Sequence, residues 1–379
     1  YGDHRDLHLS IRRQRQMCIR DRDISLEAKK LAAIFEATGA EVVEMDFLQI
    51  SNLLLDLYGE DIRGRAFITN DPVYGEMMLR PDFTIPIVEQ HMANNVSPAR
   101  YTYCGKVFRR QEEFPDRPRE FMQVGYEIFD GANPAKADAE IFSLVNDALS
   151  GIKVRISTGD IGILMAAVSS LSTTETRKKS LLRHIWRPQR FRTLLNQFSG
   201  LSSKPHPIKD AKDYNKIIDK FEIIGSRNVQ EIKERLQQLK SEHETAPIDS
   251  AEVKILDDIL SLKDTSKVAL SYLEKVSKKM PGIEKTVDNF AKRLDFLENN
   301  GVNVDLLDFE GSYGRTSMEY YDGFVFGFYS ETHKDLAPLA TGGRYDALTE
   351  RMGQGKRIPA VGAVLRPDLT LLLRGNEHD

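Results

Sequence analysis

The stretch KVFRRQEEFPDRPREFMQVGYEIFD, residues 106–130, decides the fold. Polar and apolar residues alternate on both sides of a charged loop that contains proline, which predicts two antiparallel strands joined by that loop. Alternate side chains of a strand share a face, so Gln123, Gly125 and Glu127 point the same way. A glycine between two polar residues leaves room for a ligand to approach the sheet. The alternative interpretation is an ordinary half-solvated strand.

Three more stretches place polar residues on predicted strands. They are LRPDFTIP (79–86), TSMEYYDGFVFGFY (316–329) and ATGGRYDALTERMG (340–353). Their candidate site residues are Arg80, Asp82 and Thr84, then Glu319, Tyr320 and Tyr321, then Gly342, Gly343 and Arg344. The stretch 106–130 adds Arg109, Arg117 and Arg119. Four such sets in one chain favour a shared pocket over four unrelated solvated strands.

The chain as a whole has the pattern of a sheet backed by helices. Strand patterns fill much of 23–159 and return after about residue 300 in VNVDLLDFEG, YYDGFVFGFYS, GGRYDALTERMG and IPAVGAVLRPDLTLLL. Hairpins outnumber regular βαβ crossovers, which favours an α+β fold with a mostly antiparallel sheet. Residues 160–295 are rich in Lys, Glu, Leu and Ile at helical spacing. They predict a helical insertion between two parts of the core, 23–159 and 296–379.

The first 22 residues are excluded from this fold prediction. They hold six Arg and three Asp, without the apolar segment of a signal peptide or the low acid content of a transit peptide. The run MCIRDR, residues 17–22, is what a transposon end used in DNA library preparation encodes in one reading frame. We predict that residues 1–22 are adapter-derived, or otherwise a disordered basic tail.

The composition excludes several classes of protein. The net charge of −4 argues against broad nucleic-acid binding, and no apolar run is long enough to span a bilayer. The two cysteines, Cys18 and Cys104, make no metal cluster or disulfide framework and fit a reducing cytoplasm. The stretch GQGKR (353–357) lacks the full spacing of a phosphate loop. We therefore expect no metal and no cofactor.

Together, the four polar sets resemble the core of class II histidyl-tRNA synthetases. The stretch 106–130 resembles their second motif, Arg-x-Phe-x-Gln-x-Gly-x-Glu after an Arg-bearing strand and a loop. The segment LRPDFTIP resembles their Leu-Arg-Pro-Glu-x-Thr segment, and MEYYDGFVF resembles their histidine-specific Leu-Asp-Tyr-Tyr-Thr-Gly-x-Val-Phe stretch. The resemblance spans residues 23–379 apart from the insertion. It implies a class II synthetase-like core, a mostly antiparallel sheet flanked by helices.

The departures from this pattern concern the residues that activate an amino acid. Charge develops on phosphate and carboxylate during activation, so preorganised cations are required. The synthetases have one Arg where this chain has Thr316 and another where it has Leu369, and their anticodon-binding domain has no counterpart here. This combination is similar to the regulatory subunits of ATP phosphoribosyltransferase, non-catalytic relatives of the synthetases. The segment WRPQRF (186–191) also resembles bacterial members of that family.

The resemblance implies a role in the first step of histidine biosynthesis. Such subunits form a homodimeric core, join a short-form catalytic subunit, a glycosyltransferase, in a hetero-octamer, activate it and mediate inhibition by histidine. The alternatives are a truncated histidyl-tRNA synthetase and another class II-like binding module. The implied histidine contacts are Asp82, Thr84, Arg109, Gln123, Glu127, Tyr320 and Tyr321, with Arg117 and Arg119 as further contacts to the carboxylate or another anion. A cytoplasmic protein without membrane or nucleic-acid partners is expected.

Overall fold

The computed structural model describes most of the chain. The described residues are 21–51, 62–94, 96–111, 117–202, 228–234, 245–315 and 320–375. The predicted tail therefore falls outside them except for Asp21 and Arg22, which begin a helix over 21–36. Thr316 and Glu319 also lie outside the described residues.

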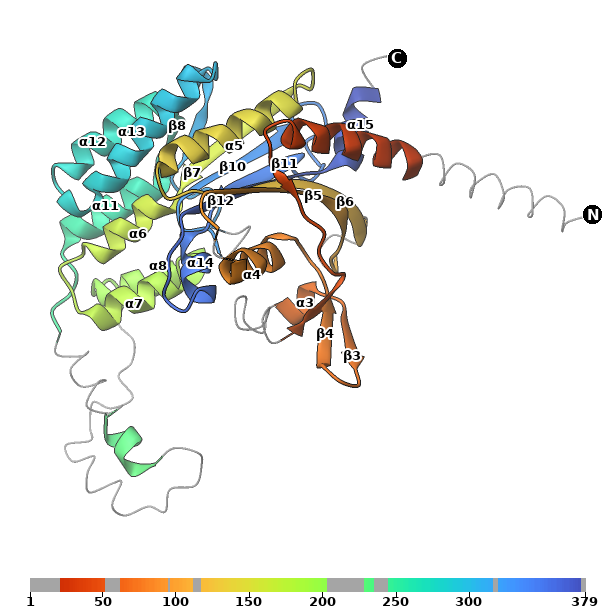
Figure 1. The fold of residues 1–379 in the computed structure, drawn as a ribbon. Helices are drawn as coiled ribbons and strands as arrows, with labels where there is room; N and C mark the ends of the chain where they lie inside the picture. Colours follow the sequence, from red (N-terminus) through yellow and green to blue (C-terminus); the bar gives the residue numbers. More distant parts are fainter. Residues whose placement is uncertain are drawn as a thin grey trace, which may run out of the picture.

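A nine-stranded sheet forms the centre of the fold (Figure 1). Its order is β1-β5-β6-β12-β11-β10-β7-β9-β8, and neighbours are antiparallel except β1 with β5 and β7 with β9. The strands are β1 Glu41–Val42, β5 Ala99–Phe108, β6 Glu120–Phe129, β7 Val154–Asp160, β8 Lys263–Thr265, β9 Asp308–Glu310, β10 Phe324–Ser330, β11 Ala340–Arg344 and β12 Ala360–Leu365. The predicted hairpin is confirmed, because β5 and β6 pair over their whole length.

Helices cover both faces of the sheet (Figure 1). On one face lie the helix over 21–36, α5 (Pro134–Ala148) and α13 (Glu284–Asn299), and on the other lie α4 (Thr84–Asn94) and α14 (Asp346–Met352). Helix α5 begins where Pro134 follows the N-cap Asn133, whose side chain accepts a hydrogen bond from the Lys136 amide at 3.1 Å.

The segment 160–295 supplies helices and one strand. The described helices are α6 Ile161–Ser169, α7 Glu175–Arg183, α8 Pro188–Phe198, α11 Ser250–Ser261, α12 Ser266–Ser277 and α13, with a 3₁₀ turn at Pro281–Ile283. Strand β8, inside this segment, pairs with β9 and so belongs to the central sheet. The segment is thus attached through the sheet as well as by helix packing, and its status as a separate insertion stays a prediction.

A second, three-stranded sheet lies apart from the central one (Figure 1). Its order is β2-β4-β3, from Leu48–Ile50, Gly75–Leu79 and Ile68–Asp71. Strands β3 and β4 pair as a hairpin around the turn at residues 72–74. The short helix α3 (Ile62–Arg65) precedes β3.

Two predictions of strand near the C-terminus were wrong in part. Residues 346–352 form α14 and residues 367–375 form α15 (Pro367–Gly375), directly after β11 and β12. Likewise, only 308–310 of the segment 302–311 is strand, after a 3₁₀ turn at Val304–Leu306. Short helices that follow a strand at once leave too few residues to show a helical period. No helix in the described ranges is both long and apolar enough to cross a membrane.

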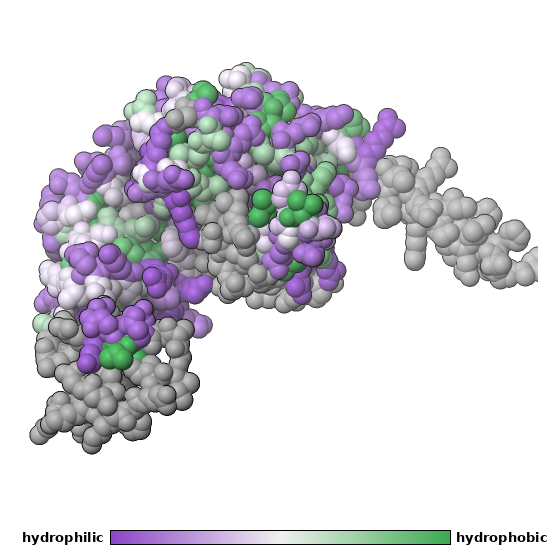
Figure 2. Space-filling view, turned by 60° about the horizontal axis from the view of Figure 1, so that its bottom comes forward, coloured by the Kyte–Doolittle hydropathy of each residue, from purple (hydrophilic) through white to green (hydrophobic). Residues whose placement is uncertain are grey.

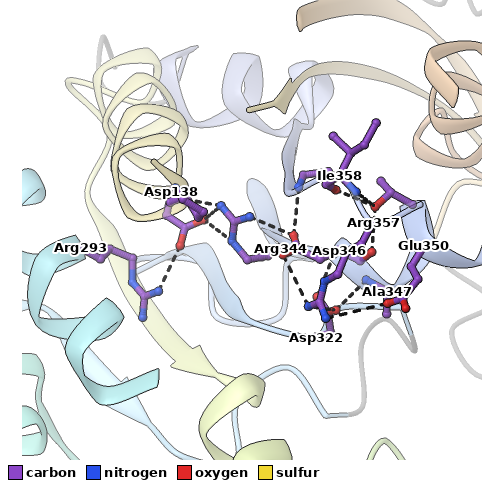
Figure 3. A network of polar contacts seen from close by, with 12 residues as sticks. Asp138, Arg293, Asp322, Arg344, Asp346, Ala347, Glu350, Arg357 and Ile358 are labelled. Atoms are coloured by element: carbon purple, nitrogen blue, oxygen red, sulfur yellow. Dashed lines mark hydrogen bonds and ion pairs between the residues drawn. The ribbon is translucent and has the colours of Figure 1, made fainter. Parts of the chain in front are cut away.

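A buried network of ion pairs connects these elements (Figure 3). Asp138 of α5 accepts hydrogen bonds from Arg293 of α13 at 3.1 Å and from Arg344 of β11 at 2.6 Å. Arg293 also reaches Asp160 at 2.8 Å, and Arg344 reaches Asp346 at 2.9 Å. All five residues are at least nine-tenths buried. The network thus joins three segments of chain that lie far apart in sequence.

We predict that Arg293→Ala lowers the free energy of unfolding by about 3–5 kcal/mol, because it leaves Asp138 and Asp160 buried without this cation. The matched control is Lys292→Ala on the same helix, an exposed position where a change within about 0.5 kcal/mol is expected. Urea denaturation of both variants measures the difference. Equal losses in the two would show that the pairs contribute nothing specific.

Candidate functional site

The candidate site is built around Glu127, a fully buried carboxyl near the end of β6. Three hydroxyls donate hydrogen bonds to it. Thr84, the first residue of α4, reaches Oε1 at 3.0 Å, and Tyr103 of β5 reaches the same oxygen at 3.4 Å. Tyr345, which precedes α14, reaches Oε2 at 2.5 Å. The carboxyl therefore ties two strands of the sheet to the two helices that cover this face.

Glycines on three neighbouring strands make room for these side chains. A Cβ atom at Gly125 of β6 would lie 2.1 Å from the Tyr103 ring. A Cβ atom at Gly362 of β12, the residue opposite Glu127, would lie 1.6 Å from Glu127 Oε2. A Cβ atom at Gly343 of β11 would lie 2.8 Å from the ring of Tyr321. Since each aromatic or acidic group occupies the space of a missing side chain, the floor of the site depends on glycine.

Burial sets the protonation of the central carboxyl. Burial, with a smaller contribution from the charge of Asp82, raises the pKa of Glu127 from 4.5 to about 8, although the three hydroxyl donors oppose the rise. Burial also raises the pKa of Tyr103, Tyr321 and Tyr345, with the charge of Glu127 as the next cause. The protonated carboxyl is thus favoured near neutral pH until a cation is placed beside it.

Asp82 and Arg109 lie at the same site. The charge of Asp82 contributes to the raised pKa of Tyr321, and the charge of Arg109 opposes the rise, so both charges act on that phenol. Arg109 is anchored by a 2.7 Å hydrogen bond from its Nε to the Pro81 carbonyl. The other guanidinium nitrogens of Arg109 are suited to donating hydrogen bonds to a carboxylate.

Arg80 has a structural position beside the site. Its guanidinium carbon lies 4.0 Å from the centre of the Phe83 ring and 4.3 Å from that of Phe47. Its Nε donates to the Lys106 carbonyl at 2.9 Å. These contacts hold the chain in place just before Asp82. The guanidinium of Arg80 therefore has a structural role.

Gln123 provides a buried acceptor that the described residues leave unused. The residue is 2% exposed, and its Oε1 has no hydrogen-bond partner there. Buried polar atoms are normally paired, so an orphan at a candidate site indicates a ligand or water. Gln123 shares its face of β6 with Gly125 and Glu127, as the alternation of the sequence predicted.

Tyr320 and Tyr321 close one side of the site. Their rings meet edge to face with centroids 4.8 Å apart, and Tyr320 also lies 6.0 Å from Tyr345. The carbonyl of Tyr321 accepts a 3.0 Å hydrogen bond from Nε1 of Trp186, between α7 and α8. The site is therefore in direct contact with the segment predicted as an insertion.

The other predicted positions lie at the edge of the site or outside the description. Arg119 is exposed, and its carbonyl accepts from the Arg109 amide at 2.8 Å; Arg117 is half-buried. Among the described residues, no contact is found between either side chain and Glu127. Leu369, in α15, is half-buried and packs against the hydrophobic core. Thr316 lies beyond the described residues.

Sequence reasoning did not identify Tyr103, Tyr345 or Trp186 as parts of the site. Tyr103 shares the site face of β5, because it lies opposite Gly125 in the register. Strand alternation and the pairing of β5 with β6 were both predicted, so the register would have found it. Tyr345 and Trp186 precede α14 and α8, and only the helix placement brings them here.

Comparison with known proteins identifies one family. The model described as Histidyl-tRNA synthetase matches residues 21–241 and 208–369. An ATP phosphoribosyltransferase regulatory subunit from Rhizobium etli (strain CIAT 652) is 30% identical over 357 residues, or 88% of this chain and 93% of that protein. The protein of the same name from Rhizobium rhizogenes is 29% identical and covers 89% of this chain and 95% of that protein.

Solved structures confirm the class II synthetase-like fold. A structure from Bacillus halodurans C, described as an ATP phosphoribosyltransferase regulatory subunit/histidyl-tRNA synthetase, has a TM-score of 0.64 and 20% identity. It covers 93% of this chain and 79% of that one. The histidyl-tRNA synthetase of Nostoc sp. PCC 7120 has a TM-score of 0.60 and 16% identity, with 95% and 73% covered. At these identities the likeness concerns the fold.

The pKa of Glu127 predicts a pH dependence of stability. The folded chain binds this proton more tightly than the unfolded chain, so the contribution is complete below about pH 4.5 and is lost as the pH rises through about 8. Relative to Glu127→Gln, the unfolding free energy of the parent should fall with pH in this window, by up to about 1.4 kcal/mol per pH unit.

Urea denaturation at several pH values across that window measures the difference. The control is Glu89→Gln, an exposed position on α4, whose stability should follow the parent at every pH. Parallel curves for the parent and Glu127→Gln would contradict the assignment of the raised pKa to this carboxyl.

Proposed function

The chain belongs to the histidyl-tRNA synthetase-like family of ATP phosphoribosyltransferase regulatory subunits, and we propose that it activates a short-form catalytic subunit and lets histidine inhibit it. The complex catalyses the first step of histidine biosynthesis, and the chain itself carries no catalytic activity. The alignment with relatives of that name, at 29–30% identity over 93–95% of their length, carries the proposal.

The candidate site supports a role in binding histidine. Glu127 and the hydroxyl of Tyr321 suit the two imidazole nitrogens, because each nitrogen needs a donor or an acceptor according to its protonation. Asp82, Thr84 and the orphan Oε1 of Gln123 suit the ammonium group. Arg109 suits the carboxylate. A cation beside the protonated Glu127 carboxyl would favour its ionised form, so binding is coupled to proton release.

The absence of catalysis is supported by Leu369. The synthetases resembled by the sequence have an ATP-facing Arg at this position, and here a half-buried leucine packs against the core. Ground-state binding of an amino acid does not need the cations that stabilise charge in the transition state. A truncated histidyl-tRNA synthetase is the second candidate function, favoured by the description of the family model.

We also propose that the chain forms a homodimer within a cytoplasmic hetero-octamer. Exposed apolar side chains on the small sheet support contact with another chain, and Figure 2 shows green residues gathered there. Val73 is 83% exposed and Tyr74 is 67% exposed in the turn between β3 and β4. Ile68 and Leu48 on the strands beside it are also exposed. Patches of this kind mark interaction surfaces.

Gln123→Leu tests the histidine site with little risk to folding. The variant removes a buried polar group that has no partner for Oε1 in the described residues, so stability should hold or rise. Calorimetry should show histidine binding at least about tenfold weaker. The control Met122→Leu changes the neighbouring side chain, on the opposite face of β6, and should bind as the parent does. Unchanged histidine binding in Gln123→Leu would show that Gln123 does not contact histidine.

Reconstitution tests the regulatory role. The chain, mixed with the short-form catalytic subunit of the same genome, should raise the rate of phosphoribosyl transfer to ATP, and histidine should lower that rate. The chain alone should give no histidine-dependent exchange of pyrophosphate into ATP. Pyrophosphate exchange by the chain alone would show that it is a histidyl-tRNA synthetase. An unchanged rate of the catalytic subunit would refute activation.

A further inference from the structure

The corner between α7 and α8 concentrates positive charge in a chain of negative net charge. Residues 174–192 contain seven Lys or Arg and one Glu, whereas the whole chain carries −4. The exposed members at the corner are Arg183, Arg187, Arg190 and Arg192. Arg192 pairs with Asp257 of α11. In the described part of the chain, Arg183 and Arg190 have no carboxylate partner.

The first turn of α8, at the same corner, has no capping side chain. The helix is eleven residues long and begins at Pro188. Its N-cap residue, Arg187, makes no side-chain capping hydrogen bond. An N-terminus without a capping side chain presents backbone N–H groups and the positive end of the helix dipole, which together favour an anion.

A buried arginine points to the same ligand independently. Arg315 is 5% exposed, and its Nε donates to the Ile185 carbonyl at 2.7 Å, two residues before the N-cap of α8. Its guanidinium carbon lies 4.9 Å from the centre of the Phe191 ring, in the first turn of α8. Its Nη2 has no hydrogen-bond partner among the described residues. A buried guanidinium with an unused donor is unfavourable unless an anion compensates it.

The charges at the corner act on one another. Burial, with a smaller contribution from the charge of Arg192, lowers the pKa of Arg315 to about 10. Burial likewise lowers the pKa of His184, and the next causes are Arg190, Arg187 and Arg183. Burial is the larger cause of both shifts, and the neighbouring arginine charges add to it. An anion with more than one charge would offset the repulsion between these arginines.

We propose that the corner between α7 and α8 binds a small molecule that carries phosphate groups, held by Arg183, Arg190, Arg315 and the N-terminus of α8. Guanidinium groups match the geometry of phosphate oxygens, and several of them together favour a diphosphate over a single carboxylate. The negative charge of the whole chain disfavours a long nucleic acid. The proposal does not depend on histidine, although Trp186 connects this corner with Tyr321.

Titration of the full chain with pyrophosphate, and separately with inorganic phosphate, tests the proposal by calorimetry at physiological ionic strength. Pyrophosphate should bind more tightly than phosphate. The double variant Arg183→Gln/Arg190→Gln removes two exposed charges that make no described ion pair, and it should weaken pyrophosphate binding at least about tenfold. The control Lys334→Gln removes one exposed charge in the loop after β10, and its affinity should stay within about twofold.

Three outcomes would overturn the proposal. They are the absence of pyrophosphate binding by the parent chain at millimolar concentration, equal affinity in the double variant, and binding of a single-stranded RNA oligonucleotide without binding of pyrophosphate. Thermal unfolding of the double variant confirms that it is folded, since both side chains are exposed. Loss of histidine binding is a separate readout, so the two proposals fail independently.

Discussion

The pairs that Asp138 makes with Arg293 and Arg344 hold the central sheet and its helices in one arrangement. Burying one carboxylate between two guanidinium groups is tolerated only because the hydrogen-bond geometry is nearly complete. Arg344 continues to Asp346, and Asp322 accepts from the amides of Asp346 and Ala347 at 2.9 and 2.7 Å (Figure 3). Since Asp322 follows Tyr321 directly, the position of Tyr321 at the candidate site depends on the same charges.

The candidate site follows from a second constraint, the absence of side chains at three glycines on adjacent strands. Gly125, Gly343 and Gly362 lie on adjacent strands, and each one's missing Cβ is replaced by a group from elsewhere in the chain. Glu127 can be fully buried there because hydroxyls from β5, α4 and the start of α14 reach its two oxygens. The result is a buried polar site inside a tightly packed interior, whose carboxyl is surrounded by hydrogen-bond donors.

Much of the fold was predictable from local patterns, and much of the site was not. Alternation predicted β5, β6 and the shared face of Gln123 and Glu127, because a strand's side chains have a fixed period. Helices α14 and α15 were missed because they follow strands without a break. The contact of Glu127 with Tyr103 follows from the register of β5 and β6, which the alternation could have supplied. The hydrogen bond with Tyr345 depends on helix placement, which no local pattern of a single sequence encodes.

The bond between Trp186 and the Tyr321 carbonyl gives the molecule a natural optical probe. The chain contains one tryptophan, and its indole nitrogen contacts the backbone of the pocket wall. Emission excited selectively from that indole therefore reports on a single place, without labels and without a background from other tryptophans. A rearrangement that lengthens this contact changes the polarity around the indole ring. The wavelength of the emission therefore reports on movement of the Tyr321 backbone relative to Trp186.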